Sequence, residues 1–261
     1  MVAAALQADL RMIRNELQRR LRRLLSGSQT GVPAWTPLVE VGDDLGLFAP
    51  SDAPWVVHAD IATTIGGVRA LLVQALHPGS LAGVMQHSRY EEDVLGRLHG
   101  TIRWLTISTF GSRAAIEQEA ARVRAMHERV RGTYIDEHEQ QRSYQASDQD
   151  LLQWVHLAFT ESFLSTHLRY GRKAIPGGAD AYVAQWGAAV TPLGLTNPPT
   201  SEQELPLRSI RSWEKFSELP ALRVLWSMRR LVTEIYVIPW RMSKKRGAPS
   251  VTKLPAVSRS A

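Results

Sequence analysis

The chain has 261 residues, 44% of them hydrophobic, so it is long enough to bury a substantial core. It contains no cysteine, which excludes disulfides, thiolate metal sites, thiol nucleophiles and a thiolate-ligated haem. Any metal or cofactor must therefore be held by His, carboxylate, Tyr or Lys. Because the sequence shows neither an apolar run of about 18 residues nor a signal peptide, we expect a cytoplasmic protein.

The formal net charge of +6 is concentrated at the two ends of the chain. Residues 1–25 carry six arginines against two acids, and residues 241–261 carry six basic residues and no acid. This last segment is also rich in Ser and Pro, which predicts a basic, disordered tail. Since the excess charge lies mainly outside the folded region, we expect no nucleic-acid partner.

The N-terminal segment, residues 1–54, predicts an amphipathic helix followed by a Pro- and Gly-rich linker. Apolar residues recur at three- and four-residue steps, and the opposite face is rich in arginine; the apolar stripe comprises Leu6, Leu10, Ile13, Leu17, Leu21 and Leu24. The helix either docks on its own domain with its charges in water, or serves as a reversible anchor at the periphery of an anionic membrane, or mediates self-association. Breaks at Pro and Gly between residues 31 and 56 predict the linker.

Residues 55–240 predict an all-α fold, a single multi-helix globular domain. We expect helices over 61–76, 81–87, 94–110, 113–131, 151–170, 179–193 and 213–237. Asp93, Ser112 and Asp148 stand where N-caps would stand, and Gly132 and Gly171 where helices would end. Alternating strand patterns with Asn-Gly or Asp-Gly turns are absent, so we expect no strands.

His127 lies on the apolar stripe of the helix expected over 113–131, and so faces inward. A buried imidazole is either hydrogen-bonded within the core, which is the simpler interpretation, or coordinates something. A zincin helix is excluded, because the residue four after His127 is Arg131, and no Glu is followed by a His three positions later. Nucleotide-binding loops and a serine elbow are also absent. The common cofactor that needs only one strong protein ligand is haem.

Three ordered segments carry a family resemblance: "LHPGSLAGVMQHSRYEEDVLGRLHGTIRWLTISTFGS", "VRAMHERVRGTY" and "YQASDQDLLQWVH". Over residues 60 to 238 the chain resembles the DUF2236 family, the helical domain of latex-clearing rubber oxygenases and fungal MpaB-type oxygenases. The resemblance implies that His127, in "AMHERV", is the proximal iron ligand of haem b. It also implies that Arg97 and Thr101, in "RLHGT", match the distal pair.

One departure from the family concerns the position before Thr101. Rubber oxygenases carry a lysine there that can close the sixth iron position, whereas this chain has Gly100. A glycine cannot coordinate, so we expect the distal position to be open, filled by water, or reached by another side chain such as His99. Arg97 and Thr101 share one helical face and could hydrogen-bond dioxygen or a haem propionate. The alternative is an arginine paired with a carboxylate such as Asp93.

Three further residues are candidates for the cofactor's surroundings. His156 shares a helical face with His167, and either lies near the cofactor and supports the surroundings of His127 or is an ordinary core histidine. Arg124 and Arg131 lie within one turn of His127 and could reach propionates, although exposed charges paired with Glu128 are the simpler interpretation.

The sequence therefore predicts a haem b-dependent oxygenase, an oxidoreductase that cleaves or hydroxylates an apolar small molecule with dioxygen. Its metal would be the haem iron held by His127. The alternatives are a haem-binding sensor or carrier without turnover, and a structural helical protein without cofactor.

Overall fold

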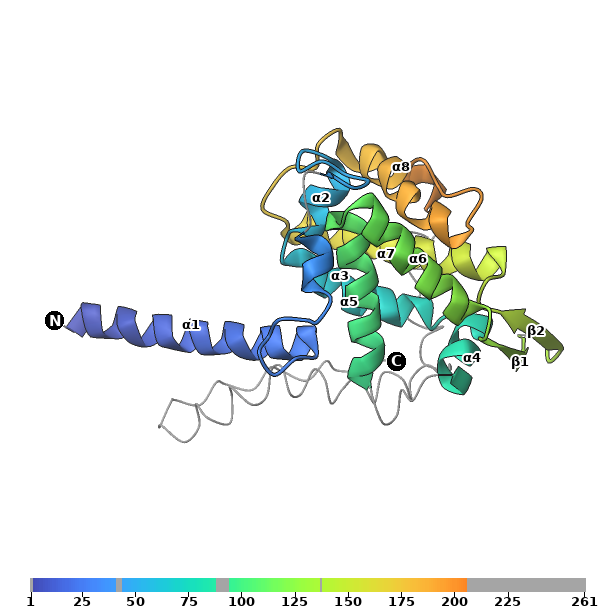
Figure 1. Ribbon diagram of the computed structural model, residues 1–261, viewed down its shortest axis with the longest axis horizontal. Helices are drawn as coiled ribbons and strands as arrows, with labels where there is room; N and C mark the ends of the chain where they lie inside the picture. The colour runs from blue at the N-terminus through green and yellow to red at the C-terminus, as the bar shows by residue number, and fades with distance from the viewer. Residues whose placement is uncertain (1, 41–43, 88–93, 137, 206–261) are drawn as a thin grey trace, which may run out of the picture.

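The computed structural model describes residues 2–40, 44–87, 94–136 and 138–205. The protein is mainly helical, which confirms the predicted fold class (Figure 1). The elements in chain order are α1 Val2–Ser26, the 3-10 helix η1 Thr36–Val39, α2 Ala53–His58, α3 Ala62–Gln74, α4 Pro78–His87, α5 Val94–Phe110, α6 Arg113–His127, β1 Arg131–Ile135, β2 Gln141–Gln145, α7 Gln149–Tyr170, α8 Gly178–Val190, η2 Thr191–Leu193 and η3 Glu202–Glu204. Asp93, the helix expected over 213–237 and the tail over 241–261 lie outside the described residues.

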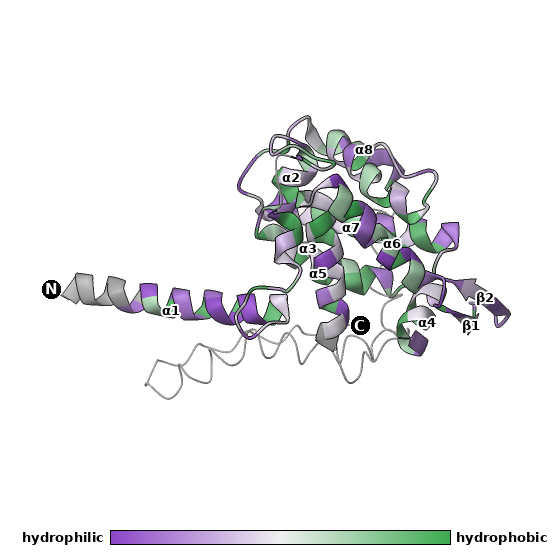
Figure 2. Ribbon diagram, viewed as in Figure 1, coloured by the Kyte–Doolittle hydropathy of each residue, from purple (hydrophilic) through white to green (hydrophobic). Residues whose placement is uncertain are grey.

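Helices α3 and α7 form the centre of the domain and pack closely along their lengths. A Cβ at Gly66 would stand 2.7 Å from Thr166 Oγ1 and 2.8 Å from Phe163 Cδ1, so only glycine allows α3 to approach α7 here. The surrounding core gathers apolar side chains from α2, α7 and α8, including Val57, Leu164 and Trp186. Figure 2 shows hydrophobic residues concentrated in this helical body.

Helices α5 and α6 form an antiparallel hairpin that joins at Gly111 and Ser112 (Figure 1). As the sequence predicts, Ser112 caps α6, because its hydroxyl accepts a hydrogen bond from the Ala115 backbone N–H at 3.2 Å. Asp44, in the linker, accepts from the Arg113 N–H at 2.7 Å and ties the linker to the same turn. The beginning of α5 and the end of α6 therefore both lie at the open end of this hairpin.

The structure corrects two expectations after His127. Helix α6 ends at His127 rather than at Arg131, and residues 131–145 form an antiparallel hairpin of β1 and β2 instead of containing no strand. The connection is held by Asp136, whose carboxylate accepts from the backbone N–H groups of His138 and Gln140, each at 2.9 Å. An aspartate-stabilised turn replaces the Asn-Gly type that a sequence search looks for.

Helix α1 meets the domain only at its C-terminal end, as far as the described residues show, and the rest of it projects away (Figure 1). Leu25 packs against a small cluster that contains Leu71 and Leu98, and the Leu24 carbonyl bonds His99. Of the apolar stripe, Ile13 and Leu17 are exposed, so the described residues do not show the alternative in which the whole stripe docks on the domain. The linker that follows α1 is loop-rich as predicted, with η1 as its short helical piece.

Candidate functional site

Arg97 lies in the first half of α5, half-buried, with an unusual lack of partners. Its guanidinium forms no hydrogen bond or ion pair with any residue that the structure describes. Burial lowers the pKa of Arg97 to about 10, which still leaves the side chain cationic at neutral pH. A desolvated cation without a counterion is costly, so this position suits an anionic or strongly accepting ligand.

His127 is the last residue of α6 and is half-buried. Within the described part of the chain, neither ring nitrogen forms a hydrogen bond, so the satisfied core histidine is not what the structure shows. The pKa of His127 is lowered first by burial and then by the positive charge of Arg97. The ring is therefore neutral at pH 7 and has a nitrogen lone pair free for coordination.

Thr101 lies one turn after Arg97 on the same face of α5 and is half-buried. Its hydroxyl donates to the Arg97 carbonyl at 3.1 Å, the local bond that threonine forms in helices. The bond uses the hydroxyl proton but leaves acceptor capacity on the oxygen. Thr101 can therefore accept from a ligand as it stands, or donate after rotating away from the helix backbone.

Arg124 and Arg131 are both exposed, and each is engaged with a backbone carbonyl. Arg124 donates to the Pro192 carbonyl, and Arg131 donates to the Glu128 carbonyl at 2.9 Å. Neither makes the expected side-chain ion pair with Glu128. Both arginines therefore already have a protein acceptor, whereas Arg97 has none among the described residues.

His156 is buried in the middle of α7, and burial lowers its pKa to about 4. Its Nδ1 has no hydrogen-bond partner among the described residues. Its Nε2 lies 3.5 Å from Thr160 Oγ1, whose proton goes to the His156 carbonyl at 2.7 Å. The polar contacts of the ring stay within α7, and none of them joins His156 to His127. The role of His156 in supporting the surroundings of His127 stays a prediction.

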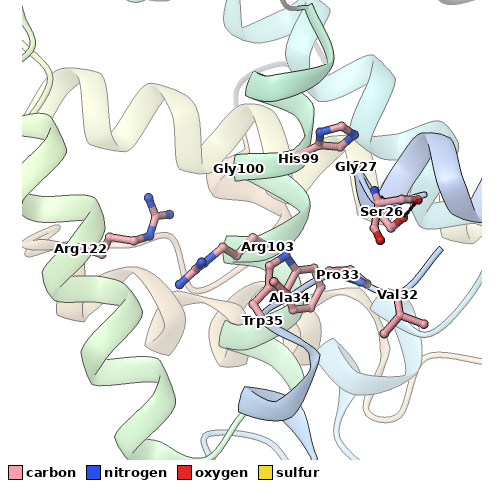
Figure 3. A pocket seen from close by; sticks show the side chains of 11 residues that line it. Ser26, Gly27, Val32, Pro33, Ala34, Trp35, His99, Gly100, Arg103 and Arg122 are labelled. Atoms are coloured by element: carbon pink, nitrogen blue, oxygen red, sulfur yellow. Dashed lines mark hydrogen bonds between the residues drawn. The ribbon is translucent and has the colours of Figure 1, made fainter. Parts of the chain in front are cut away.

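A cavity of about 540 Å³ opens beside α5, on the side that faces the base of α1. Figure 3 shows His99 and Gly100 at its wall, together with the segment that follows α1. The ring of His99 donates from Nε2 to the Leu24 carbonyl at 2.7 Å, so it holds α1 in place rather than pointing freely into the site. At Gly100 an added Cβ would meet no heavy atom within 4 Å, so this position is open.

A buried carboxylate that sequence analysis missed is bonded to two arginines that line this cavity, Arg103 and Arg122. Glu119 on α6 is 1% exposed and bonds Arg103 Nη2 at 2.8 Å and Arg122 Nη2 at 2.6 Å. Burial alone would raise the pKa of Glu119, but the bonds from Arg122 and Arg103 outweigh it and lower the pKa. The sequence feature that indicates its burial is its spacing, because Glu119 follows Ile116 by three residues and so lies on the apolar stripe of the helix.

The described residues contain no cluster of three or more His, Asp or Glu able to hold a metal ion. None of the described helices is long and apolar enough to cross a membrane. What the fold and site define is a helical domain in which a neutral histidine, His127, lies near a desolvated arginine, Arg97, and neither side chain has a partner among the described residues. Both lie at the open end of the α5–α6 hairpin.

Comparison with known families identifies the family of this helical domain. Residues 55–246 match the family model described as ER-bound oxygenase mpaB/B'/Rubber oxygenase, catalytic domain. The chain therefore belongs to this family of oxygenase catalytic domains. No curated protein and no solved structure is significantly similar to it.

Proposed function

We propose that the protein is a haem b-dependent oxygenase that oxidises an apolar small molecule with dioxygen, using His127 as the iron ligand. Membership of the oxygenase family gives the reaction class. The observation that carries the finer proposal is the pairing of Arg97 with His127, because the charge of Arg97 lowers the pKa of the imidazole.

The residues present fit a haem in two respects. A haem needs one strong protein ligand, and His127 offers a neutral ring without competing hydrogen bonds in the described part of the chain. A haem also brings two carboxylates, and Arg97 is a cation that lacks a carboxylate partner there. Since no larger group of ligands is needed, the absence of a metal cluster in the described residues is compatible with this proposal.

When bound, the haem would supply the redox chemistry that activates dioxygen towards an alkene or a C–H bond. The chain's own contribution is polar and steric. Arg97 stays protonated at neutral pH and donates N–H groups, either to a carboxylate or to a reacting oxygen. Thr101 adds a hydroxyl on the same helical face. Gly100 keeps the adjacent position clear, so no side chain from it competes with dioxygen.

The test is the absorption spectrum of the purified protein, as isolated and during haem titration, with His127→Ala compared with the wild type. The matched control is His138→Ala, an exposed histidine in the β1–β2 turn. We expect a Soret band in the wild type and control that collapses or shifts in His127→Ala. Titration with haem that leaves the spectrum unchanged would overturn the proposal.

A second measurement separates an oxygenase from a sensor or carrier. The haem-loaded protein is supplied with an electron donor, dioxygen and a panel of apolar alkenes, and oxygen consumption is followed with product analysis. Oxidised product that is lost in His127→Ala supports the oxygenase proposal. Haem binding without any turnover across the panel would favour a binding function.

A further inference from the structure

The exposed apolar stripe of α1 is the feature that the proposed function leaves unused. Along the projecting part of the helix, Ile13 is 65% exposed and Leu17 is 51% exposed. Figure 1 shows this part extending away from the domain, and Figure 2 shows hydrophobic and hydrophilic residues alternating along it. Large exposed apolar side chains in a regular array mark an interaction surface.

We propose that α1 docks the protein on an anionic lipid surface, lying in the plane of the interface. Ile13, Leu17 and Leu21 follow at four-residue steps, so at about 100° per residue they form one stripe along the helix. On the same wheel, Arg14 and Arg20 fall at the two borders of the stripe. Arginines in these positions can extend to the lipid headgroups while the stripe enters the acyl boundary.

The charge of α1 selects the occupant of this surface. The helix carries six arginines against two acids, Asp9 and Glu16. Glu16 is itself bonded by Arg19 and Arg20, each at 2.8 Å, so one of the two acids is already paired within the helix. Two copies of such a helix would repel each other, whereas anionic headgroups attract each arginine. A lipid surface is therefore favoured over a second copy of the chain.

The base of α1 is fixed to the domain, which gives the docking a consequence for the cavity. The His99–Leu24 bond and the packing of Leu25 hold the last turns of α1 against α5. A Cβ at Gly27 would stand 2.6 Å from His99 Nδ1, so the backbone just after α1 packs closely against the His99 ring on α5. Ser26 and Gly27 also line the cavity that reaches Gly100. Lipid docking through α1 would therefore set this cavity near the membrane surface.

The experiment is co-sedimentation of the full chain with vesicles of phosphatidylcholine containing 30% phosphatidylglycerol, compared with pure phosphatidylcholine. The test variants are Ile13→Ser/Leu17→Ser, which removes the stripe, and Arg11→Gln/Arg14→Gln, which removes charge. We expect binding to the anionic vesicles only, weakened at least about tenfold by the stripe variant and measurably by the charge variant. The controls are Leu168→Ser and Arg113→Gln, exposed residues on the domain whose changes we expect to leave binding intact.

Three outcomes would overturn the proposal. The first is equal sedimentation of the wild type and Ile13→Ser/Leu17→Ser. The second is a loss of vesicle binding only when Lys244, Lys245 and Arg246 are changed to Gln, because the basic tail would then be the segment that binds the lipid. The third is a dimer in light scattering that Ile13→Ser/Leu17→Ser dissociates, without vesicle binding by the wild type. Circular dichroism and thermal unfolding of each variant check that the domain is intact. Because the readout requires neither haem nor turnover, its failure is separable from failure of the proposed function.

Discussion

Arg97 on α5 lies close enough to His127 at the end of α6 for its charge to lower the pKa of the imidazole. The α5–α6 hairpin produces this relationship, because its short turn sets the two residues at similar distances from Gly111. Burial disfavours the charged form of both groups, and Arg97 has no counterion among the described residues to offset this cost. Such an arrangement is typical of a site built for a ligand.

The first prediction concerns the protonation of His127. Replacing Arg97 with Met removes the positive charge, so the pKa of His127 should rise in the cofactor-free protein. Burial should still keep it below the ordinary histidine value, because burial is the larger cause of the shift. The measurement is an NMR pH titration of the His127 ring signals. Arg124→Met, one turn earlier on α6, is the control and should leave the titration unchanged; an equal shift in both variants would contradict the relationship.

The second prediction uses Gly100. Because no heavy atom lies within 4 Å of an added Cβ, Gly100→Ala should raise the free energy of unfolding by about 0.5–1 kcal/mol through helix propensity. Gly100→Lys should also fold, and in the haem-loaded protein its amine should change the Soret band towards a six-coordinate form. Thermal unfolding and absorption spectra measure the two effects.

Gly111→Ala provides the matched control, since its Cβ would stand 2.6 Å from the Ile107 carbonyl oxygen. This variant should lose stability where Gly100→Ala gains it. A loss of stability in both variants would show that Gly100 is not in open space.

Helical periodicity and caps predicted most of the fold. Ser112 and Gly171 mark real helix boundaries, because a capping hydroxyl and a helix-ending glycine act locally. The error after His127 has a local cause as well. Val130 continues the three-residue spacing of the stripe beyond the true end of α6, and nothing in that spacing reveals the Asp136 turn that closes the β hairpin.

The candidate site was predictable to a different degree for each residue. The inward orientation of His127 can be predicted from the apolar stripe of a single helix. The proximity of Arg97 to His127 cannot, because it depends on how α5 and α6 are arranged relative to each other. The engagement of Arg131 with a carbonyl depends on the β hairpin, which the sequence pattern did not reveal. Likewise, the exposure of Ile13 could not be predicted, because an amphipathic stripe looks the same whether it faces a domain or a lipid surface.

The third prediction concerns Glu119, whose carboxylate is buried between two arginines. Glu119→Gln should lower the free energy of unfolding by about 1–3 kcal/mol, since Arg103 and Arg122 lose their counterion but remain partly exposed to water. The folded pKa of Glu119 is lowered, so its contribution is present above the unfolded pKa of a glutamate and is lost as pH falls through the folded value. Chemical denaturation at pH 7 and at pH 3 measures both effects.

Glu117→Gln is the control for this change, because Glu117 is exposed two residues earlier on the same helix. Its effect on stability should stay within about 0.5 kcal/mol. Equal effects of the two substitutions would rule out a special contribution of the buried ion pairs.

The fourth prediction concerns acid stability and follows from two histidines that are buried in the neutral form. Burial lowers the pKa of His58 to about 3 and that of His156 to about 4. His58 bonds Thr109 Oγ1 at 2.8 Å and the Tyr182 hydroxyl at 2.9 Å, so both nitrogens of its neutral ring are satisfied. Nδ1 of His156, by contrast, finds no partner in the part of the chain that the structure describes.

Both rings bind a proton in the unfolded chain below pH 6.5, the ordinary histidine value, but stay neutral in the folded protein down to their lowered pKa values. The contribution of these two rings to stability is therefore fully present above pH 6.5 and should fall as pH drops towards 4, by about 1.4 kcal/mol per pH unit for each ring. His156→Leu removes one of these titrating rings and, with it, a buried nitrogen that lacks a partner among the described residues. The variant should therefore reduce the slope of the unfolding free energy against pH by about 1.4 kcal/mol per pH unit and lower the stability little at pH 7. Urea denaturation at several pH values measures the slope, with His138→Leu as an exposed control. A slope that His156→Leu leaves unchanged would mean that this ring is protonated in the folded protein, and the cause would then have to be sought in a group that faces Nδ1.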